Sequence, residues 1–252
     1  MKLVIEHLSQ SYDGKNRVLD DISFSFDQGR MYGLLGVNGS GKTTFFNCLN
    51  GLIPYEGKAW LEDDYGHREV LSAKNLGMVL TDPMLPEFLT GYEFIKAFLE
   101  ISEVKTDRSI AEYFKLIAID ETDQHRLIKD YSMGMKHKLQ ILMYLISQPK
   151  IILLDEPLTS LDVVVASEIK QMLRDLVEDH IIIFSTHIME LAVSMCDEIA
   201  VINHRRLELI NPDIIHDAGF EEEIVGILKG KETAVEQDAG LSAEEIPDSP
   251  ES

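Results

Sequence analysis

The sequence predicts an α/β protein whose main sheet is largely parallel. Apolar segments at residues 151–154, 181–184 and 199–202 alternate with segments of helical spacing at about residues 163–178 and from Ile188 onward. Strands that are apolar throughout are buried on both faces, which is typical of a parallel sheet covered by helices on each side. Two further patterns predict an N-terminal antiparallel β subdomain and an inserted α-helical subdomain.

The N-terminal region is expected to form antiparallel strands. Residues 3–8 are mainly apolar, residues 13–16 read Asp-Gly-Lys-Asn and are typical of a turn, and residues 22–26 alternate apolar with polar side chains. This alternation predicts one buried face. Residues 31–35 then form a short apolar strand that leads into a glycine-rich loop and a helix over about residues 42–50.

The middle of the chain is predicted to be a helical insertion over about residues 83–143. Apolar residues recur at helical spacing in residues 92–101, 109–119 and 135–146, and no strong strand pattern appears before Lys150. The insertion therefore separates the glycine-rich loop from the parallel strands that follow.

The C-terminal end differs in composition from the rest. Residues 221–252 include ten acidic residues and two lysines. We expect one domain over residues 1–230 and a disordered acidic tail over residues 231–252. The tail has few large aliphatic side chains, and burying them cannot offset the conformational entropy that the tail would lose on ordering. Four apolar residues before the tail recur at helical spacing and predict a short amphipathic helix that packs on the core or contacts a partner: Phe220, Ile224, Ile227 and Leu228.

Composition and charge exclude several classes of protein. The formal net charge of -21 at pH 7 opposes non-specific binding to nucleic acid, because phosphate is repelled on average. The first residues lack the pattern of a signal peptide, and no apolar run reaches the ~20 residues of a membrane-spanning helix. We therefore expect a chain that is soluble by itself. Cys48 and Cys196 are expected to be small buried side chains, a usage that suits a reducing cytosol.

The glycine-rich loop fits the phosphate-binding pattern G-x-x-x-x-G-K-[ST]. Its residues are Gly36, Val37, Asn38, Gly39, Ser40, Gly41, Lys42 and Thr43. Glycines let backbone N–H groups turn inward around phosphates, and the helix N-terminus adds positive potential. We expect Lys42 to reach the β and γ oxygens of a nucleotide and the Thr43 hydroxyl to ligate Mg²⁺. The loop predicts a P-loop NTPase core but leaves open a kinase, a GTPase, a helicase or a transport ATPase.

Two carboxylates follow the apolar strand at residues 151–154. Because side chains alternate along a strand, Asp155 and Glu156 can face different tasks. One task is to hold Mg²⁺ through water, and the other is to polarise an attacking water. A solvated strand end is the alternative, but the Pro-Leu-Thr-Ser-Leu-Asp run at residues 157–162 and the Ser-Thr-His run at residues 185–187 favour the catalytic interpretation.

Taken in order, these motifs resemble those of the ABC ATPase family over the span from Tyr12 to His187. Residues 36–44, which end at Thr44, resemble the Walker A loop; residues 151–156 resemble the Walker B strand; residues 160–162, which end at Asp162, resemble the D-loop. The resemblance implies ATP and Mg²⁺ as ligands and ATP hydrolysis as the reaction.

Individual roles follow from the resemblance. It implies Glu156 as general base or water positioner, with Lys42 on the phosphates and His187 as the switch histidine that senses the γ-phosphate. Without the family, His187 at a strand end would be structural. The resemblance also implies that Tyr12 stacks on adenine, where the residue alone would be an ordinary strand-end tyrosine.

Residues 131–135, Tyr-Ser-Met-Gly-Met, occupy the place of the family signature, usually Leu-Ser-Gly-Gly-Gln. Ser132 and Gly134 match, whereas Met133 and Met135 depart and resemble the form found in bacterial export cassettes. In the family, the signature offers donors to a γ-phosphate held by another copy. The resemblance therefore implies a head-to-tail dimer, expected to be a homodimer. Ser132 also suits the N-cap of the helix that follows.

The sequence departs from the family at the Q-loop, where a glutamine normally touches the metal and senses the membrane partner. Aligning residues 77–80 with the usual strand places Thr81 there, followed by Asp82. Either Thr81 or Asp82 is thus left as an oxygen ligand for Mg²⁺ beside Thr43 and Asp155.

Three functions are compared. The first is a motor subunit on the cytoplasmic face of the membrane that drives a separate transmembrane permease, by resemblance for export of a peptide, bacteriocin or drug; residues 85–93 resemble the surface that receives the permease. The second is a soluble ABC ATPase acting on a cytosolic assembly, such as iron–sulfur cluster biogenesis. The third, a P-loop kinase or switch without a dimer, leaves Ser132, Gly134 and His187 unexplained.

Overall fold

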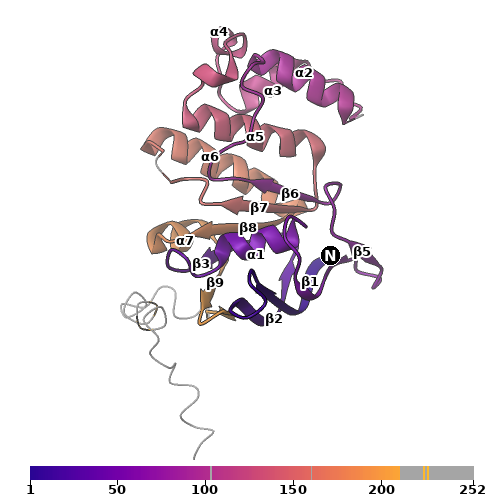
Figure 1. The fold of residues 1–252 in the computed structure, drawn as a ribbon. Helices are drawn as coiled ribbons and strands as arrows, with labels where there is room; N and C mark the ends of the chain where they lie inside the picture. Colours follow the sequence, from indigo (N-terminus) through magenta and orange to yellow (C-terminus); the bar gives the residue numbers. More distant parts are fainter. Residues whose placement is uncertain (103, 160, 211–223, 225, 227–252) are drawn as a thin grey trace, which may run out of the picture.

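Two β-sheets with a helix between them form the centre of the molecule (Figure 1). The structure is a computed structural model that describes residues 1–102, 104–159, 161–210, 224 and 226. One sheet has four antiparallel strands in the order β2-β1-β4-β5, and the other has six strands in the order β10-β9-β3-β8-β7-β6. The predicted α/β fold, with its N-terminal antiparallel sheet and mainly parallel main sheet, is confirmed.

The antiparallel sheet begins with the two strands that the sequence predicted. β1 (Lys2–Ser11) pairs with β2 (Arg17–Asp27), and Leu3 lies opposite Phe26. β4 (Glu56–Glu62) and β5 (Arg68–Val70) complete the sheet.

Strand β4 was missed by the sequence analysis because Glu-Gly-Lys at its start has no strand pattern. Gly57 has a φ of 96°, and a Cβ there would collide with the backbone of His7 in β1. The strand therefore passes β1 at a register shift where only glycine has room.

The main sheet carries the remaining strands. These are β3 (Arg30–Leu35), β6 (Leu76–Val79), β7 (Ile151–Asp155), β8 (Ile181–Thr186), β9 (Glu198–Asn203) and β10 (Arg206–Leu209). All pairs are parallel except β9 with β10, and β10 was not predicted.

Both faces of the main sheet are buried, as its continuous apolar strands predicted. Along β7, Ile151 and Leu153 pack toward α1 (Lys42–Leu49) and the antiparallel sheet. Ile152 and Leu154 pack into the other core, with α5 (Met133–Ser147), α6 (Val163–Leu176) and α7 (Met189–Met195). Burial of alternate side chains in two separate cores fixes the register of the strand.

A group of helices lies beyond α5, at the top of Figure 1. They are α2 (Gly91–Ile101), α3 (Ile110–Leu116), α4 (Glu121–Gln124) and the 3₁₀ turn Ile128–Asp130, and a second 3₁₀ turn, Val177–Asp179, follows α6. Capping boxes at Thr90 and Ser109 start α2 and α3, with the side chain of each cap bonded to the residue three positions later. Helix α5 ends four residues beyond residue 143, the predicted end of the helical insertion. That boundary stays a prediction.

The C-terminal expectations are reached only in part. Ile224 is buried against Leu35, Val201 and Ile210. Phe220, Ile227, Leu228 and the predicted tail at residues 231–252 lie outside the described residues.

Cys48 is buried in α1, whereas Cys196 follows α7 and is half-buried. In the described part of the chain, no helix combines the length and the apolar character needed to cross a bilayer.

Candidate functional site

The glycine-rich loop leaves β3 and ends where α1 begins at Lys42. Gly39 and Gly41 have φ of 81° and 109°, in the left-handed region that favours glycine. A Cβ on Gly41 would lie 2.9 Å from Cδ2 of Leu19, and a Cβ on Gly36 would run into Oγ of Ser40. The glycines at the predicted spacing therefore have a steric cause, and they let the loop close tightly at the N-terminus of α1.

Lys42 is 6% exposed and lies inside the curve of the loop. Its Nζ donates to the carbonyl of Gly36 at 2.7 Å and lies 3.7 Å from Oε1 of Glu156. Burial lowers the pKa of Lys42, while the carboxylates of Glu156 and Asp155 oppose that shift. The ammonium thus lies beside the carboxylate of Glu156, which directly follows β7, and within the electrostatic influence of Asp155, the last residue of that strand.

A cavity of about 360 Å³ opens over this loop. Its lining consists of Tyr12, Val18, Asn38, Gly39, Gly41, Lys42, Thr43, Thr44 and Glu156. Tyr12 is 66% exposed, and its hydroxyl lies 3.1 Å from Oγ1 of Thr44. The cavity has the size of a small-molecule site, with donors at its floor for phosphates and an open ring for a planar base. These residues fit a nucleoside triphosphate.

The Walker aspartate is held by two hydroxyl groups. Thr43 Oγ1 donates to Oδ2 of Asp155 at 2.8 Å, and Ser185 Oγ donates to Oδ1 at 2.6 Å. This small oxygen donor set fits Mg²⁺, which takes one or two protein oxygens and completes its shell with water and substrate phosphates. Within the described ranges no group of three or more His, Cys, Asp or Glu side chains forms a metal cage.

Glu156 turns sharply away from β7. Its φ of 51° is left-handed, and its N–H donates to Ser185, which lies opposite Asp155 on β8. The turn places Asp155 toward Thr43 and sends the Glu156 carboxylate toward the loop. There Oε1 lies 2.9 Å from Nδ1 of His187 and Oε2 accepts from Thr159 at 3.0 Å. The structure thus brings Glu156, His187 and Lys42 together.

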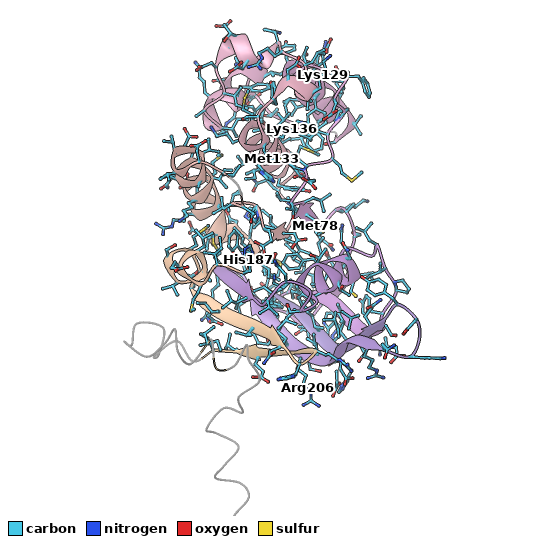
Figure 2. The ribbon with its side chains drawn as sticks, turned by 60° about the vertical axis from the view of Figure 1, so that its left-hand side comes forward. Met78, Lys129, Met133, Lys136, His187 and Arg206 are labelled. Atoms are coloured by element: carbon cyan, nitrogen blue, oxygen red, sulfur yellow. The ribbon has the colours of Figure 1, made fainter. Side chains whose placement is uncertain are left out.

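Ser132 and Gly134 lie at the start of α5, away from the loop cavity, whose lining they do not join. Ser132 is the N-cap, and its hydroxyl accepts from the N–H of Met135 at 3.2 Å. A Cβ on Gly134 would lie 2.6 Å from Cγ1 of Val165, in the first turn of α6. Figure 2 shows the neighbouring Met133 on the same side of the molecule as Lys129 and Lys136, between them and Met78.

Asp162 caps α6 beside this helix start. Its Oδ1 accepts from the N–H groups of Val164 and Val165, at 3.0 Å each. The predicted signature and D-loop residues therefore form a second cluster, separate from the phosphate loop of the same chain. Ser160 lies outside the described residues.

Thr81 joins the site through the backbone of Asp155. Its Oγ1 donates to the main-chain carbonyl of Asp155 at 2.8 Å, and its own carbonyl lies 3.1 Å from Nε2 of His137. The predicted metal ligand is thus engaged beside the Walker aspartate, and its role as a ligand stays a prediction. Asp82 is exposed next to it.

Sequence reasoning assigned no site role of their own to four residues, although two of the motif runs it used contain Thr159 and Ser185; the four are Val18, Thr159, Ser185 and His137. Ser185 had a usable signal, because it stands at the carboxyl end of β8, and neighbouring parallel strands end at one edge of the sheet. Val18 and Thr159 had no such signal, since an ordinary strand valine and a loop threonine occur in many contexts. His137 lies far from the loop in sequence and reaches Thr81 only through tertiary packing.

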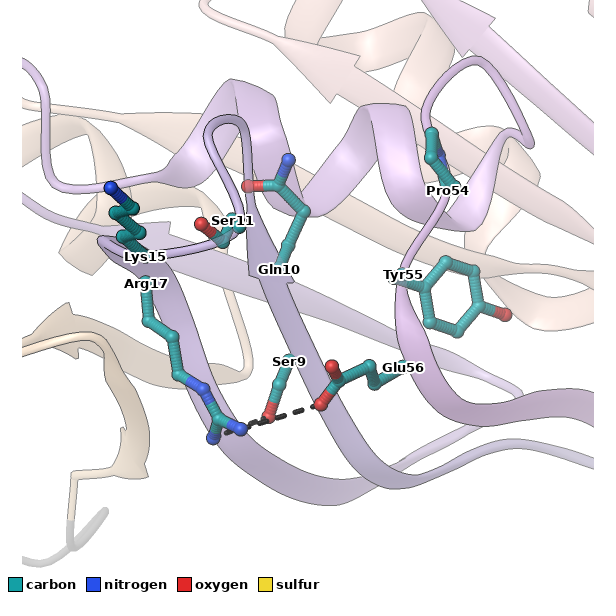
Figure 3. Close-up of a pocket in the computed structure, with 9 residues that line it drawn as sticks. Ser9, Gln10, Ser11, Lys15, Arg17, Pro54, Tyr55 and Glu56 are labelled. Carbon is teal, nitrogen blue, oxygen red and sulfur yellow. Dashed lines mark hydrogen bonds and ion pairs between the residues drawn. The ribbon is translucent and has the colours of Figure 1, made fainter.

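A second cavity of about 360 Å³ lies on the antiparallel sheet (Figure 3) and contains none of the predicted site residues. Arg17 crosses its wall and donates to Oγ of Ser9 and Oε2 of Glu56, at 3.4 and 3.3 Å. Its charge is thus already neutralised within the protein. The loop cavity, by contrast, unites a lysine, a carboxylate and a phosphate-binding backbone.

Comparison with known proteins matches residues 19–159 to the family model described as ABC transporter. The ABC transporter ATP-binding protein YybJ of Bacillus subtilis (strain 168), itself uncharacterised, is 32% identical over 198 residues, which cover 77% of this chain and 89% of YybJ. The lantibiotic transport ATP-binding protein SrtF of Streptococcus pyogenes is 28% identical over 215 residues, covering 82% of this chain and 89% of SrtF.

Solved structures agree with these relatives. A structure described as the ATP-binding subunit of an ABC transporter superposes with a TM-score of 0.73 and 25% identity, over 91% of this chain and all of the other. The family match includes the phosphate loop, the signature helix and the Walker B strand. The chain therefore belongs to the ABC transporter family, as one of its ATP-binding subunits, which are ATPases.

Proposed function

We propose that the chain forms a head-to-tail dimer on binding ATP and thereby drives a separate transmembrane permease for export. One observation carries the dimer: Ser132 and Asp162 cap the starts of α5 and α6, which touch at Gly134 and Val165, and neither cap residue lines the nucleotide cavity of its own chain. A capped helix start that presents N–H groups suits a phosphate, and a second copy placed head-to-tail supplies one.

Within each copy, the loop residues position the triphosphate. The backbone N–H groups of the loop surround the phosphates, and Lys42 shifts from the Gly36 carbonyl to phosphate oxygens. Thr43 and Asp155 would hold Mg²⁺, which supplies charge neutralisation at the β and γ oxygens when bound. Tyr12 offers its exposed ring to the base.

Glu156 is the residue best placed to orient and polarise the attacking water. His187 and Thr159 hold its two oxygens, so its carboxylate has one defined direction. His187, beside Glu156, can sense the γ-phosphate as this group is cleaved from ATP. The arrangement supports hydrolysis that proceeds only after the second copy closes the site. In the closed dimer, Ser132 of the second copy completes the set of groups around the γ-phosphate.

A role in transport through a permease is supported by two observations. SrtF, whose name gives it a role in lantibiotic transport, is 28% identical to this chain over 215 residues. Apolar side chains are exposed just after Thr81, with Met84 83% and Phe88 79% exposed. This surface is suited to receive an apolar segment of the permease, and its position after the Q-loop would link permease movement to Asp155. Relatives named for transport favour this function over iron–sulfur cluster assembly.

The dimer is tested with the Glu156→Gln variant, which keeps the shape of the side chain but cannot act as a base. With ATP and Mg²⁺, light scattering on the eluting protein should show a dimer for this variant and a monomer when Lys42→Ala is added. The native protein should hydrolyse ATP. A native enzyme that hydrolyses ATP while Glu156→Gln stays monomeric at every ATP concentration would refute the proposal. The permease is tested separately, by co-purification from membranes.

A further inference from the structure

One face of α5 carries polar side chains against the edge of the main sheet. His137, Gln140 and Tyr144 follow each other at helical spacing and reach toward β6. β6 ends the strand order of the sheet, with β7 as its partner among the described strands. An edge strand presents backbone groups that need partners. Side chains of α5 supply them.

Tyr144 and Gln140 serve the strand itself. The Tyr144 hydroxyl donates to the carbonyl of Met78 at 2.7 Å and accepts from the N–H of Met78 at 3.0 Å. Gln140 Nε2 lies 3.5 Å from the same carbonyl. These contacts end at Met78, within β6, and satisfy a strand edge in the ordinary way.

His137 differs because it reaches beyond the strand. It is 1% exposed, and its Nε2 lies 3.2 Å from the carbonyl of Leu80 and 3.1 Å from that of Thr81. Carbonyl oxygens only accept, so Nε2 carries the proton and donates to the two carbonyls. Burial lowers the pKa of His137, which favours the neutral imidazole with its proton on Nε2. The residue is therefore a fixed donor between a helix and a loop.

This donor stands between the two halves of the proposed composite site. On one side, Ser132 caps the same helix five residues earlier. On the other, Thr81 Oγ1 donates to the carbonyl of Asp155, whose carboxylate accepts from Thr43. A continuous path of short contacts thus runs from the signature helix to the metal-binding end of β7.

We propose that His137 is a positioning residue that fixes the start of α5 relative to Thr81 and Asp155. The proposal rests on the proposed function, since it assigns His137 to the turnover of an ATP site shared by two copies. Its effect should appear in the rate of hydrolysis rather than in ATP binding, because its two hydrogen bonds go to Leu80 and Thr81, neither of which lines the loop cavity.

Three variants separate positioning from mere packing. His137→Leu keeps an apolar volume but removes the donor; His137→Gln restores an N–H donor at similar reach. Tyr144→Phe is the matched control, because it removes a part-buried hydroxyl bond between the same helix and β6, the strand that leads to Thr81, without touching Thr81 itself. We expect His137→Leu to lower kcat roughly tenfold at unchanged KM, as loss of an outer-shell partner does. His137→Gln should recover most of the rate, and Tyr144→Phe should stay within about twofold of the native kcat.

A double-mutant cycle adds a second check. Thr81→Val removes the hydroxyl that bonds to the Asp155 carbonyl, and because Thr81 is an exposed residue this variant should fold even if His137→Leu does not. If both residues act on one path, Thr81→Val should show the same loss in kcat at unchanged KM, and the double variant should lose little more than the worse single variant. Equal losses in His137→Leu and Tyr144→Phe, or full additivity with Thr81→Val, would overturn the proposal.

Hydrogen exchange distinguishes failure of this inference from failure of the proposed function. If the native protein does not hydrolyse ATP, the proposed function fails, but exchange can still be measured on the full chain by mass spectrometry. His137→Leu should speed exchange in the peptide that contains Asp155 and Glu156, whereas Tyr144→Phe should leave that peptide unchanged. Unchanged exchange in both variants would show that His137 positions nothing at the end of β7.

Discussion

Thr43 donates a hydrogen bond of 2.8 Å to the carboxylate of Asp155, although 112 positions separate the two residues in sequence. The bond joins the start of α1, where Thr43 lines the loop cavity, to Asp155 at the end of β7, and the two residues together would hold Mg²⁺. Thr43→Val should therefore leave ATP binding in the presence of a chelator within about twofold of native and weaken the apparent Mg²⁺ affinity at least roughly tenfold.

Thr43→Ser is the control for this prediction, because it keeps the hydroxyl and should retain the Mg²⁺ response. Calorimetry with ATP, with and without Mg²⁺, measures the ATP affinity and the apparent Mg²⁺ affinity. A Thr43→Val protein with native Mg²⁺ dependence would contradict the assignment of Thr43 as a ligand.

Tyr12 offers an exposed aromatic face at the mouth of the same cavity. Stacking with a planar base contributes about 0.5–1.5 kcal/mol, so Tyr12→Ala should raise the Kd for ATP roughly 2- to 12-fold. Tyr12→Phe keeps the ring and removes the bond to Thr44, so it should bind almost like native. Fluorescence titration with a labelled ATP analogue measures the three affinities. Equal weakening in Tyr12→Phe would mean that the hydroxyl, and not stacking, is what matters.

Gly134 is the signature position with the least room. A Cβ there would lie 2.6 Å from Cγ1 of Val165, whose β-branched side chain cannot easily turn away. Gly134→Ala should therefore lower the free energy of unfolding by about 1–3 kcal/mol, as overpacking does. Adding Val165→Ala should recover much of that loss by making room. Urea unfolding measures the cycle, and simple addition of two losses would contradict the steric account.

His180 makes stability depend on pH. Burial lowers its pKa, despite the 2.7 Å hydrogen bond from Nδ1 to the carbonyl of Leu176 that favours the charged form. The unfolded chain therefore binds more protons below about pH 6.5, and His180 reduces stability as the pH falls through that value, by at most about 1.4 kcal/mol per pH unit. In His180→Gln, the drop in Tm between about pH 7.5 and about pH 5.5 should be smaller than in the native protein. An equal drop in both would contradict this cause.

The phosphate loop and the parallel strands were predictable because their residues are local. Glycine spacing and unbroken apolar runs record the backbone directly, so Gly36 to Thr43 and β7 to β9 were placed from sequence. β4 was not, because its geometry depends on Gly57 passing His7 of another strand. The contact between His137 and Thr81 could not be predicted either, because the sequence of a helix does not show which backbone carbonyl a histidine on it will bond to.

The composite ATP site is tested most directly by a crystal structure of Glu156→Gln grown with ATP and Mg²⁺. The account predicts a dimer in which Ser132 of each copy lies within hydrogen-bond distance of the γ-phosphate that the loop of the other copy holds. A structure in which ATP fills the loop cavity, but every Ser132 remains far from any γ-phosphate, would contradict it.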